Sequence, residues 1–311
     1  MDASILIVHA DRKTQRTVQR ILGVTGYRID IADDLEQAVR LIAHAPPVLI
    51  VVDGAAVLEP RAGPFLAAAK AAGAEACMTL MGGPLGEQVP KLLGLGAVTN
   101  LLVHPMPVLA EELTITVHKL IRGDLFGVDK YLLWGTELHA FTLTRASERA
   151  DQVARLGEQV RARGQSARVA SMAMLVTDEL LSNAVHNAPV DAAGEHYRKD
   201  LRRDRELELD ARHQVEMRWG CDARYLAIEV TDAWGSLDRD TILAALAKTE
   251  VRESGGGAGM GVALAYRSCD HLVFNLAPGR RTQVIAMIDV RYPPSERVPA
   301  SSYNIFVERT P

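Results

Sequence analysis

The stretch VASMAMLVTDELLSNAVHNA, residues 169–188, decides how the C-terminal half of this chain is expected to fold. Its apolar side chains return with the helical period, at Val169, Met172, Ala173, Val176 and Leu180. This spacing predicts an amphipathic helix that is largely buried.

Three polar side chains fall four residues apart on the same helix: Glu179, Asn183 and Asn187. Residues at this spacing share one helix face. A magnesium-bound phosphate would satisfy them, because a carboxylate can accept a proton and an amide oxygen is a hard ligand of the kind that Mg²⁺ prefers. The alternative is that they form the solvated edge of a core helix.

Length and composition indicate an ordinary globular protein. The 311 residues are enough for two domains, each with its own core. The chain is 48% hydrophobic and 24% charged, with a net charge of only -4. This balance gives no electrostatic case for binding nucleic acid or an anionic membrane surface.

The location is expected to be cytoplasmic. The cysteines, Cys77, Cys221 and Cys269, are widely scattered and match no disulfide or zinc spacing. The first residues lack the pattern of a secretion signal, and no segment approaches eighteen uninterrupted apolar residues, so no membrane span is expected.

The first 125 residues alternate short apolar runs with helical patterns. Strands are expected at residues 5–8, 28–31 and 48–52, and helices at residues 14–22 and 35–43. This alternation predicts an α/β domain with a doubly wound, five-stranded parallel sheet, whose ligand crevice lies at the carboxyl ends of the strands. The third strand ends in Asp53.

Residues 4–122 resemble a response-regulator receiver domain, in which the aspartate that ends the third strand is phosphorylated. Asp53 stands at that position. The family's acidic pair falls on His9 and Ala10, and its lysine falls on His104. Without the acidic pair magnesium loses its ligands, so the resemblance implies a degenerate receiver, or pseudo-receiver.

Two points stay open in this domain. The hydroxyl expected after the fourth strand falls on Met81, although Thr79 is close enough for a shifted alignment. Asp53 is either a vestigial phosphoacceptor or an inherited strand-end residue in a domain that now binds a partner or a dimer mate.

The remaining chain divides into a connector at residues 126–135, a second domain at residues 136–290 and a tail at residues 291–311. Strands are expected at residues 138–143, 215–219, 225–231, 271–276 and 282–289, and helices at residues 147–163, 167–187 and 261–269. The charged segment 191–213 is interpreted as a solvated excursion. The result is a two-layer α/β sandwich with several helices over one mixed, mainly antiparallel sheet.

Two loop motifs follow the long helix. Gly257, Gly259 and Gly261 alternate just before a helix, where glycines let the backbone approach a phosphate and the helix N-terminus offers unpaired N–H groups. Asp232 ends a strand and is placed to accept a hydrogen bond from an amino group, with Gly235 leaving room for a flat ring. A flexible surface loop and an ordinary strand-end turn are the respective alternatives.

The order of these motifs resembles the N, G1 and G2 boxes and the terminal threonine of the GHKL ATPase superfamily, over residues 136–290. The residues that carry the resemblance are Glu179, Asn183, Asp232, Gly235, Gly257, Gly259, Gly261 and Thr282. The resemblance implies the Bergerat ATP-binding fold, with ATP and Mg²⁺ as cofactors. Adenine would be recognised by Asp232 with Thr282 nearby, Mg²⁺ would be held by Asn183, and the glycine-rich lid would cover the phosphates.

The layout most resembles the anti-sigma-factor serine/threonine kinases, whose N-box sequence ELxxNA appears here as ELLSNA. In that branch Glu179 would be the catalytic base. Two positions depart from the family: Trp234 replaces the first G1 glycine, and Asn187 replaces a late N-box histidine. His139 lies in a strand pattern and is not expected to be a phosphoacceptor.

The function expected from these motifs is a cytoplasmic signalling protein in which a pseudo-receiver regulates a GHKL kinase of the partner-switching type. Its partner would be an anti-anti-sigma-like or other signalling protein, and the family implies a homodimer. Two alternatives remain: a nucleotide-gated interaction module or scaffold without phosphoryl transfer, and a remnant of a two-component histidine kinase system.

Overall fold

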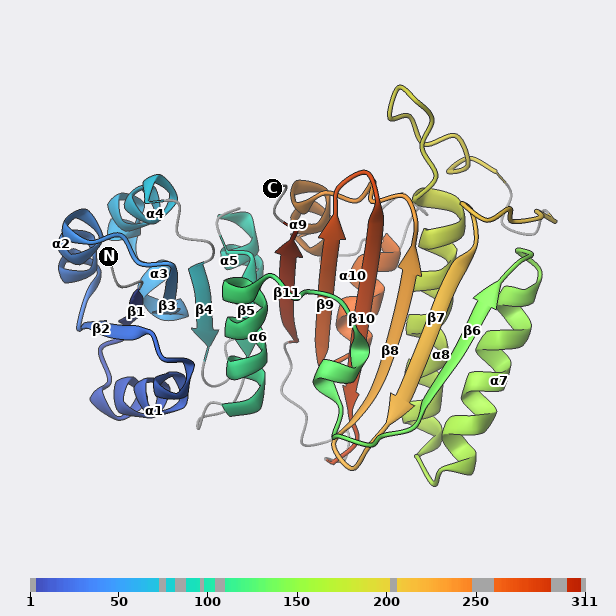
Figure 1. Cartoon of the computed structure of the whole chain (residues 1–311), viewed down its shortest axis with the longest axis horizontal. Coiled ribbons are helices and arrows are strands. Elements are labelled where there is room, and N and C mark those ends of the chain that lie inside the picture. The colour runs from blue at the N-terminus through green and yellow to red at the C-terminus, as the bar shows by residue number, and fades with distance from the viewer. Residues whose placement is uncertain are drawn as a thin grey trace. The chain divides into compact units, whose positions relative to one another are not determined.

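The computed structural model describes residues 4–72, 77–81, 88–95, 98–103, 110–201, 206–247, 260–291 and 301–308. The chain divides into two compact units (Figure 1). Unit 1 comprises Met1–Leu125 with Val298–Asn304, and unit 2 comprises Phe126–Arg297 with Ile305–Pro311. Each unit is described separately below.

Unit 1 contains a parallel sheet of five strands in the order β2, β1, β3, β4, β5. Their bounds are β1 (Ser4–Val8), β2 (Arg28–Ala32), β3 (Leu49–Asp53), β4 (Cys77–Met81) and β5 (Asn100–Val103). This is the flavodoxin-like order of a doubly wound sheet. The predicted five-stranded parallel sheet is therefore confirmed.

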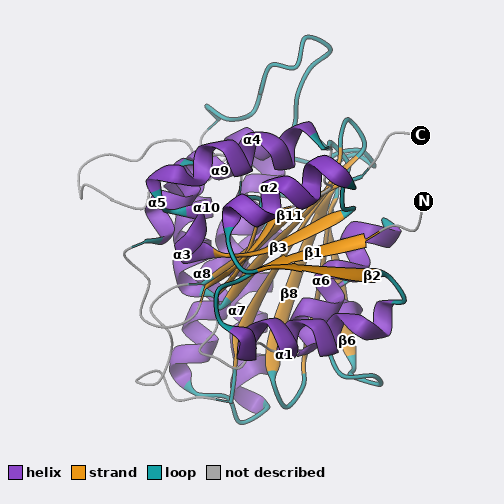
Figure 2. Cartoon of the chain, turned by 90° about the vertical axis from the view of Figure 1, so that its left-hand side faces the viewer, coloured by secondary structure: helices purple, strands orange, loops and turns teal. Residues whose placement is uncertain are grey.

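Helices cover both faces of this sheet. They are α1 (Arg12–Leu22), α2 (Leu35–His44), α3 (Gly54–Val57), α4 (Gly63–Ala71), α5 (Val89–Gly94) and α6 (Ala110–Arg122). Figure 2 shows α1 and α2 on opposite sides of the strands. Side chains alternate along each strand, so Leu49 and Val51 of β3 share a core with Val18 of α1 and Val117 of α6.

Unit 2 contains an antiparallel sheet in the order β9, β10, β8, β7, β6. The strands are β6 (Leu138–Leu143), β7 (Val215–Cys221), β8 (Tyr225–Asp232), β9 (His271–Ala277) and β10 (Arg281–Asp289). The helices are α7 (Glu148–Ala162), α8 (Ala167–Ser182), α9 (Arg239–Ala247) and α10 (Met260–Ser268). Helix α8 packs against β8 and β10, and α7 and α10 flank it, which gives one layer of helices over one sheet (Figure 1).

The long helix α8 forms where the apolar period predicts it. Ser166 caps its N-terminus by accepting a hydrogen bond from the Val169 backbone N–H. Its apolar stripe is buried, with Ala173 and Val176 fully inaccessible to solvent. Close packing with α7 occurs at Gly157, where an added Cβ would lie 2.3 Å from the sulfur of Met174.

Two segments differ from the sequence-based expectation. Helix α9 lies between the strand expected at residues 225–231 and the helix expected at residues 261–269, where the sequence predicts no helix. Strand β11 (Ser302–Val307) lies within residues 291–311, which are expected to form a tail. Tyr303 of β11 is fully buried in unit 1, and its hydroxyl donates to the Val98 carbonyl at 2.7 Å. Within the described ranges, no helix has both the length and the apolar character that crossing a membrane requires.

Candidate functional site

The C-terminal end of α8 departs from regular helix over Asn183–Asn187, which form a π-helical turn. The Ala188 backbone N–H donates to the Asn183 carbonyl at 2.9 Å, one residue further along than in an α-helix. The Asn187 Nδ2 donates to the Asn183 Oδ1 at 2.7 Å, so the two amides lie on one face. Such turns occur frequently at functional sites because they redirect side chains.

The start of α10 meets this face at Gly261. A Cβ added there would lie 2.3 Å from the Glu179 Oε2 and 3.4 Å from the Asn183 Nδ2. The structure therefore brings Glu179, Asn183 and Gly261 together. Gly257 and Gly259, predicted for the phosphate-binding loop, lie outside the described residues.

The donor set at this junction is compatible with a magnesium-bound phosphate. The Asn183 Nδ2 is buried and has no hydrogen-bond partner among the described residues. Rotation of the Asn183 and Asn187 amides together would keep the hydrogen bond between them and turn the Asn183 Oδ1 toward Gly261. Mg²⁺ commonly takes one or two protein oxygens together with substrate phosphates, so Asn183, with Glu179 beside it, could supply the protein's share.

Asp232 ends β8 on the neighbouring part of the sheet. It pairs in register with Thr282 of β10, and both residues are buried. The Asp232 Oδ1 accepts hydrogen bonds from the backbone N–H groups of Trp234 at 2.9 Å and Gly235 at 3.4 Å. Burial raises the pKa of Asp232 to about 6, and these hydrogen bonds offset part of the rise.

The loop that follows Asp232 is held on two sides. Gly235 has a φ of +60°, and a Cβ added there would lie 2.3 Å from the Ala277 carbonyl oxygen. Glycine is therefore required at position 235 because the backbone between β9 and β10 approaches too closely to leave room for a side chain. On the other side, the Ser236 hydroxyl donates to the Ala188 carbonyl at 2.7 Å, which joins the loop to the end of the π-helical turn.

Trp234 is buried under the segment between the π-helical turn and β7. The Arg212 guanidinium lies 4.2 Å from the centre of its ring, and the rings of His213 and Tyr197 lie 5.0 Å and 6.1 Å away. His213 also contacts the Asp210 carboxylate at 2.7 Å. The excursion predicted for residues 191–213 is therefore not wholly solvated, because its aromatic and cationic side chains cover an indole ring.

In unit 1, Asp53, the predicted vestigial phosphoacceptor, acts as a helix cap. It caps α3, with the Ala55 backbone N–H donating to its Oδ1 at 3.1 Å. Asp11 caps α1, and hydrogen bonds from Thr14 lower the pKa of its carboxyl group. In the described part of the chain, no group of three or more His, Cys, Asp or Glu side chains is arranged to hold a metal ion. His104 lies outside that part.

A further polar arrangement joins the connector to the sheet of unit 2 and is not evident from the sequence. The Gly127 N–H donates to the Gln283 Oε1 at 2.9 Å, and the Val128 N–H donates to the Glu229 Oε2 at 2.7 Å. Glu229 is buried, which raises the pKa of its carboxyl group, and Arg218 lies 3.5 Å from it. We call these four hydrogen-bonded residues, Gly127, Val128, Glu229 and Gln283, the connector clasp.

No family model matches the sequence, and no curated protein matches it. Among solved structures, a response regulator receiver domain from Clostridium thermocellum is 18% identical, covers 39% of this chain and 95% of its own, and has a TM-score of 0.32. The signal receiver domain of an HD domain-containing protein from Pseudomonas fluorescens is 21% identical, covers 40% of this chain and 97% of its own, and has a TM-score of 0.34. A two-component response regulator from Clostridium difficile is 21% identical, covers 39% and 96%, and has a TM-score of 0.32. At this degree of likeness they identify no activity for this chain.

Proposed function

We propose that unit 2 binds ATP with Mg²⁺ and transfers the γ-phosphoryl group to a serine or threonine of a cytoplasmic signalling partner, under the influence of unit 1. The observation that carries this proposal is the convergence of Glu179 and Asn183 with Gly261 at the end of α8. Asp232 and Thr282 belong to the same end of unit 2, because Ser236 joins the Asp232 loop to Ala188.

Each side chain has a distinct proposed role. The buried Asp232 carboxylate would accept a hydrogen bond from the adenine amino group, and Asn183 would hold Mg²⁺. Bound Mg²⁺ would neutralise the charge on the phosphates, and this neutralisation together with positioning supplies most of the catalysis in phosphoryl transfer. Glu179 would accept the proton of the incoming hydroxyl as that oxygen attacks the γ-phosphorus and ADP leaves, a contribution of roughly a hundredfold or more in rate.

Calorimetry of ATP binding, with and without Mg²⁺, tests the binding step. The Asp232→Asn variant should weaken binding in both conditions, whereas Asn183→Ala should weaken it mainly when Mg²⁺ is present. Asn275 is a matched control, because it is buried in the same sheet and donates to Gln283 at 2.8 Å on the connector face. Unchanged affinity in both site variants would refute the nucleotide site.

Phosphoryl transfer is tested separately by incubating the protein with labelled ATP and its co-purifying proteins. A label that is stable to hydroxylamine, as a phosphoserine or phosphothreonine is, should appear with the wild type and fall sharply with Glu179→Gln. Equal labelling by the two proteins would contradict the base role of Glu179.

A nucleotide-gated interaction module without phosphoryl transfer is the second candidate. The hydrogen bond from Asn187 to the Asn183 Oδ1 favours it, because the oxygen proposed to bind Mg²⁺ is already engaged. Under both functions the fluorescence of Trp234 should respond to ATP. Only the kinase should also produce ADP, so an ATP response without any turnover would support the module.

A further inference from the structure

Unit 2 has a cavity of about 290 Å³ between β6, β7 and α7. The strand register places Phe141 opposite Met217, so both side chains project from one face of the sheet. Leu156 of α7 lines the cavity from the helix side. These three side chains give the cavity an apolar floor.

The helix also gives the cavity a polar rim. Gln152, Arg155 and Gln159 all line it, and their spacing of three and four residues puts them on one face of α7. Because β6 is the last strand in the sheet order, the cavity lies at the edge of unit 2, where β6 runs beside α7 (Figure 1). A ligand could therefore enter from the side without moving the core.

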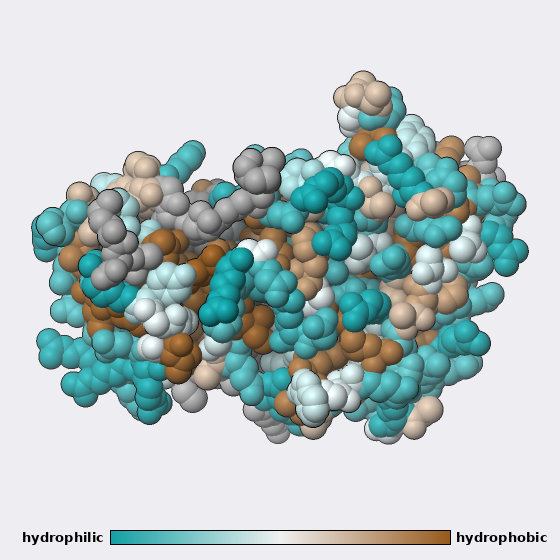
Figure 3. Space-filling model, in the orientation of Figure 1, coloured by the Kyte–Doolittle hydropathy of each residue, from teal (hydrophilic) through white to brown (hydrophobic). Residues whose placement is uncertain are grey.

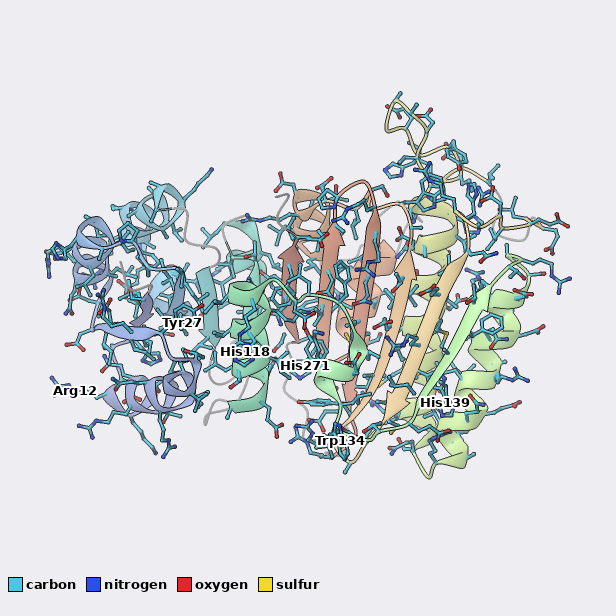
Figure 4. The ribbon with its side chains drawn as sticks, in the orientation of Figure 1. Arg12, Tyr27, His118, Trp134, His139 and His271 are labelled. Carbon is cyan, nitrogen blue, oxygen red and sulfur yellow. The ribbon has the colours of Figure 1, made fainter. Side chains whose placement is uncertain are left out.

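One wall is fixed by a stack of side chains. The rings of His139 and Trp219 lie 4.5 Å apart, and the Arg163 guanidinium lies 4.8 Å from the centre of the Trp219 ring. Arg163 also contacts the His139 Nε2 at 2.5 Å. His139 is labelled on β6 in Figure 4. This wall is formed before any ligand arrives, which lowers the ordering cost of binding.

Arg155 is the unbalanced charge of the rim. Two nearby arginines have acidic partners: Arg163 lies 3.8 Å from Glu137, and Arg149 lies 3.4 Å from Asp178. None of the residues that the structure describes forms an ion pair with Arg155. A free guanidinium beside an apolar floor suits an anion that also carries apolar surface.

We propose that this cavity binds a small amphipathic monocarboxylate, with its ring or short chain on Phe141, Leu156 and Met217 and its carboxylate on Arg155. A cavity of 290 Å³ equals the liquid volume of about ten water molecules, which suits a single ring with a short acid arm. One arginine balances one negative charge, so a doubly charged phosphate would remain partly uncompensated. The site is separate from the proposed nucleotide residues, which lie on α8, α10, β8 and β10.

Ligand-observed NMR with phenylacetate tests the proposal, with the neutral phenylacetamide as the matched probe. Phenylacetate should bind the full chain, and Arg155→Gln should weaken its binding by about 2- to 5-fold, because Arg155 is exposed and water screens an exposed ion pair. Arg161→Gln is the control, because Arg161 is exposed on the opposite face of α7 and should leave binding unchanged.

A second variant, Phe141→Ala, should weaken the binding of phenylacetate. The ratio of the affinities for phenylacetate and phenylacetamide should stay the same, because Arg155 is still present. Equal binding of the acid and the amide would overturn the role of Arg155. Failure of phenylacetate, benzoate and hexanoate alike to bind the wild type at millimolar concentration would overturn the site. Neither result would bear on ATP binding, which is measured independently.

Discussion

The buried carboxyl group of Asp232 should make the stability of unit 2 depend on pH. Its pKa is about 6, against an ordinary value of 3.8, because burial disfavours the charged form. The folded state therefore binds the proton more tightly than the unfolded state. The contribution of Asp232 to stability is therefore greatest below about pH 4 and falls by about 3 kcal/mol in total as the pH rises through about 6.

The Asp232→Asn substitution removes this ionisation while keeping the shape of the side chain. The amide oxygen of asparagine can still accept the hydrogen bond from the Trp234 backbone N–H. We therefore expect the variant to be more stable than the wild type by up to about 3 kcal/mol at about pH 7.5, and nearly equal to it at about pH 4. The same change should weaken ATP binding, as is common where a functional site is strained.

Urea unfolding followed by tryptophan fluorescence measures this difference. Trp134, Trp219 and Trp234 all belong to unit 2, so the signal reports that unit. Asp240→Asn is the control, because Asp240 is exposed on α9 and should show little change with pH. A stability difference between wild type and Asp232→Asn that stays constant from about pH 4 to about pH 7.5 would refute the reasoning.

Three further substitutions test the packing of unit 2 around the site and at the connector clasp. Gly235→Ala should destabilise unit 2 by about 2 kcal/mol or more in urea unfolding, because of its positive φ and the carbonyl 2.3 Å from the new Cβ. Gly261→Ala should change stability by less than about 1 kcal/mol, because only the flexible end of Glu179 must move, yet it should lower ADP production. Glu229→Ala should cost about 2 kcal/mol and speed proteolysis of residues 126–131, because the Val128 N–H loses its acceptor.

Hydrophobic periodicity predicts most of the secondary structure because burial acts on nearly every element. The third strand of unit 1 reads as a continuous apolar run, and Leu49–Asp53 is a strand buried on both faces. The charged segment before β7 is harder to interpret. Tyr197, Arg212 and His213 would suit a solvated loop, and only the position of Trp234 in space shows what they cover. In Figure 3, hydrophilic and hydrophobic residues are intermixed on the surface shown, so the hydropathy of a residue does not by itself tell whether it is exposed or buried.

The candidate site is partly predictable from the helical period of the sequence. Helical spacing places Glu179 and Asn183 on one face, and the structure adds Gly261 beside them. Spacing cannot predict the π-helical turn, because that turn depends on one shifted backbone hydrogen bond. Spacing also cannot predict why residue 235 is a glycine. The carbonyl group that approaches it is that of Ala277 at the end of β9, more than forty positions further along the chain.

The connector clasp and the proposed nucleotide site use opposite faces of the same strand. Side chains alternate along β8, so Glu229 faces the connector, whereas Asp232 projects from the other face, which α8 covers. Withdrawing the connector would leave the buried Glu229 and Gln283 without their backbone donors. The loss of each donor would destabilise unit 2 by about 1 to 3 kcal/mol. The connector is thus held by β8, which ends in the proposed adenine-binding residue, and by β10 through Gln283, so a change that releases it acts on the two strands that carry Asp232 and Thr282.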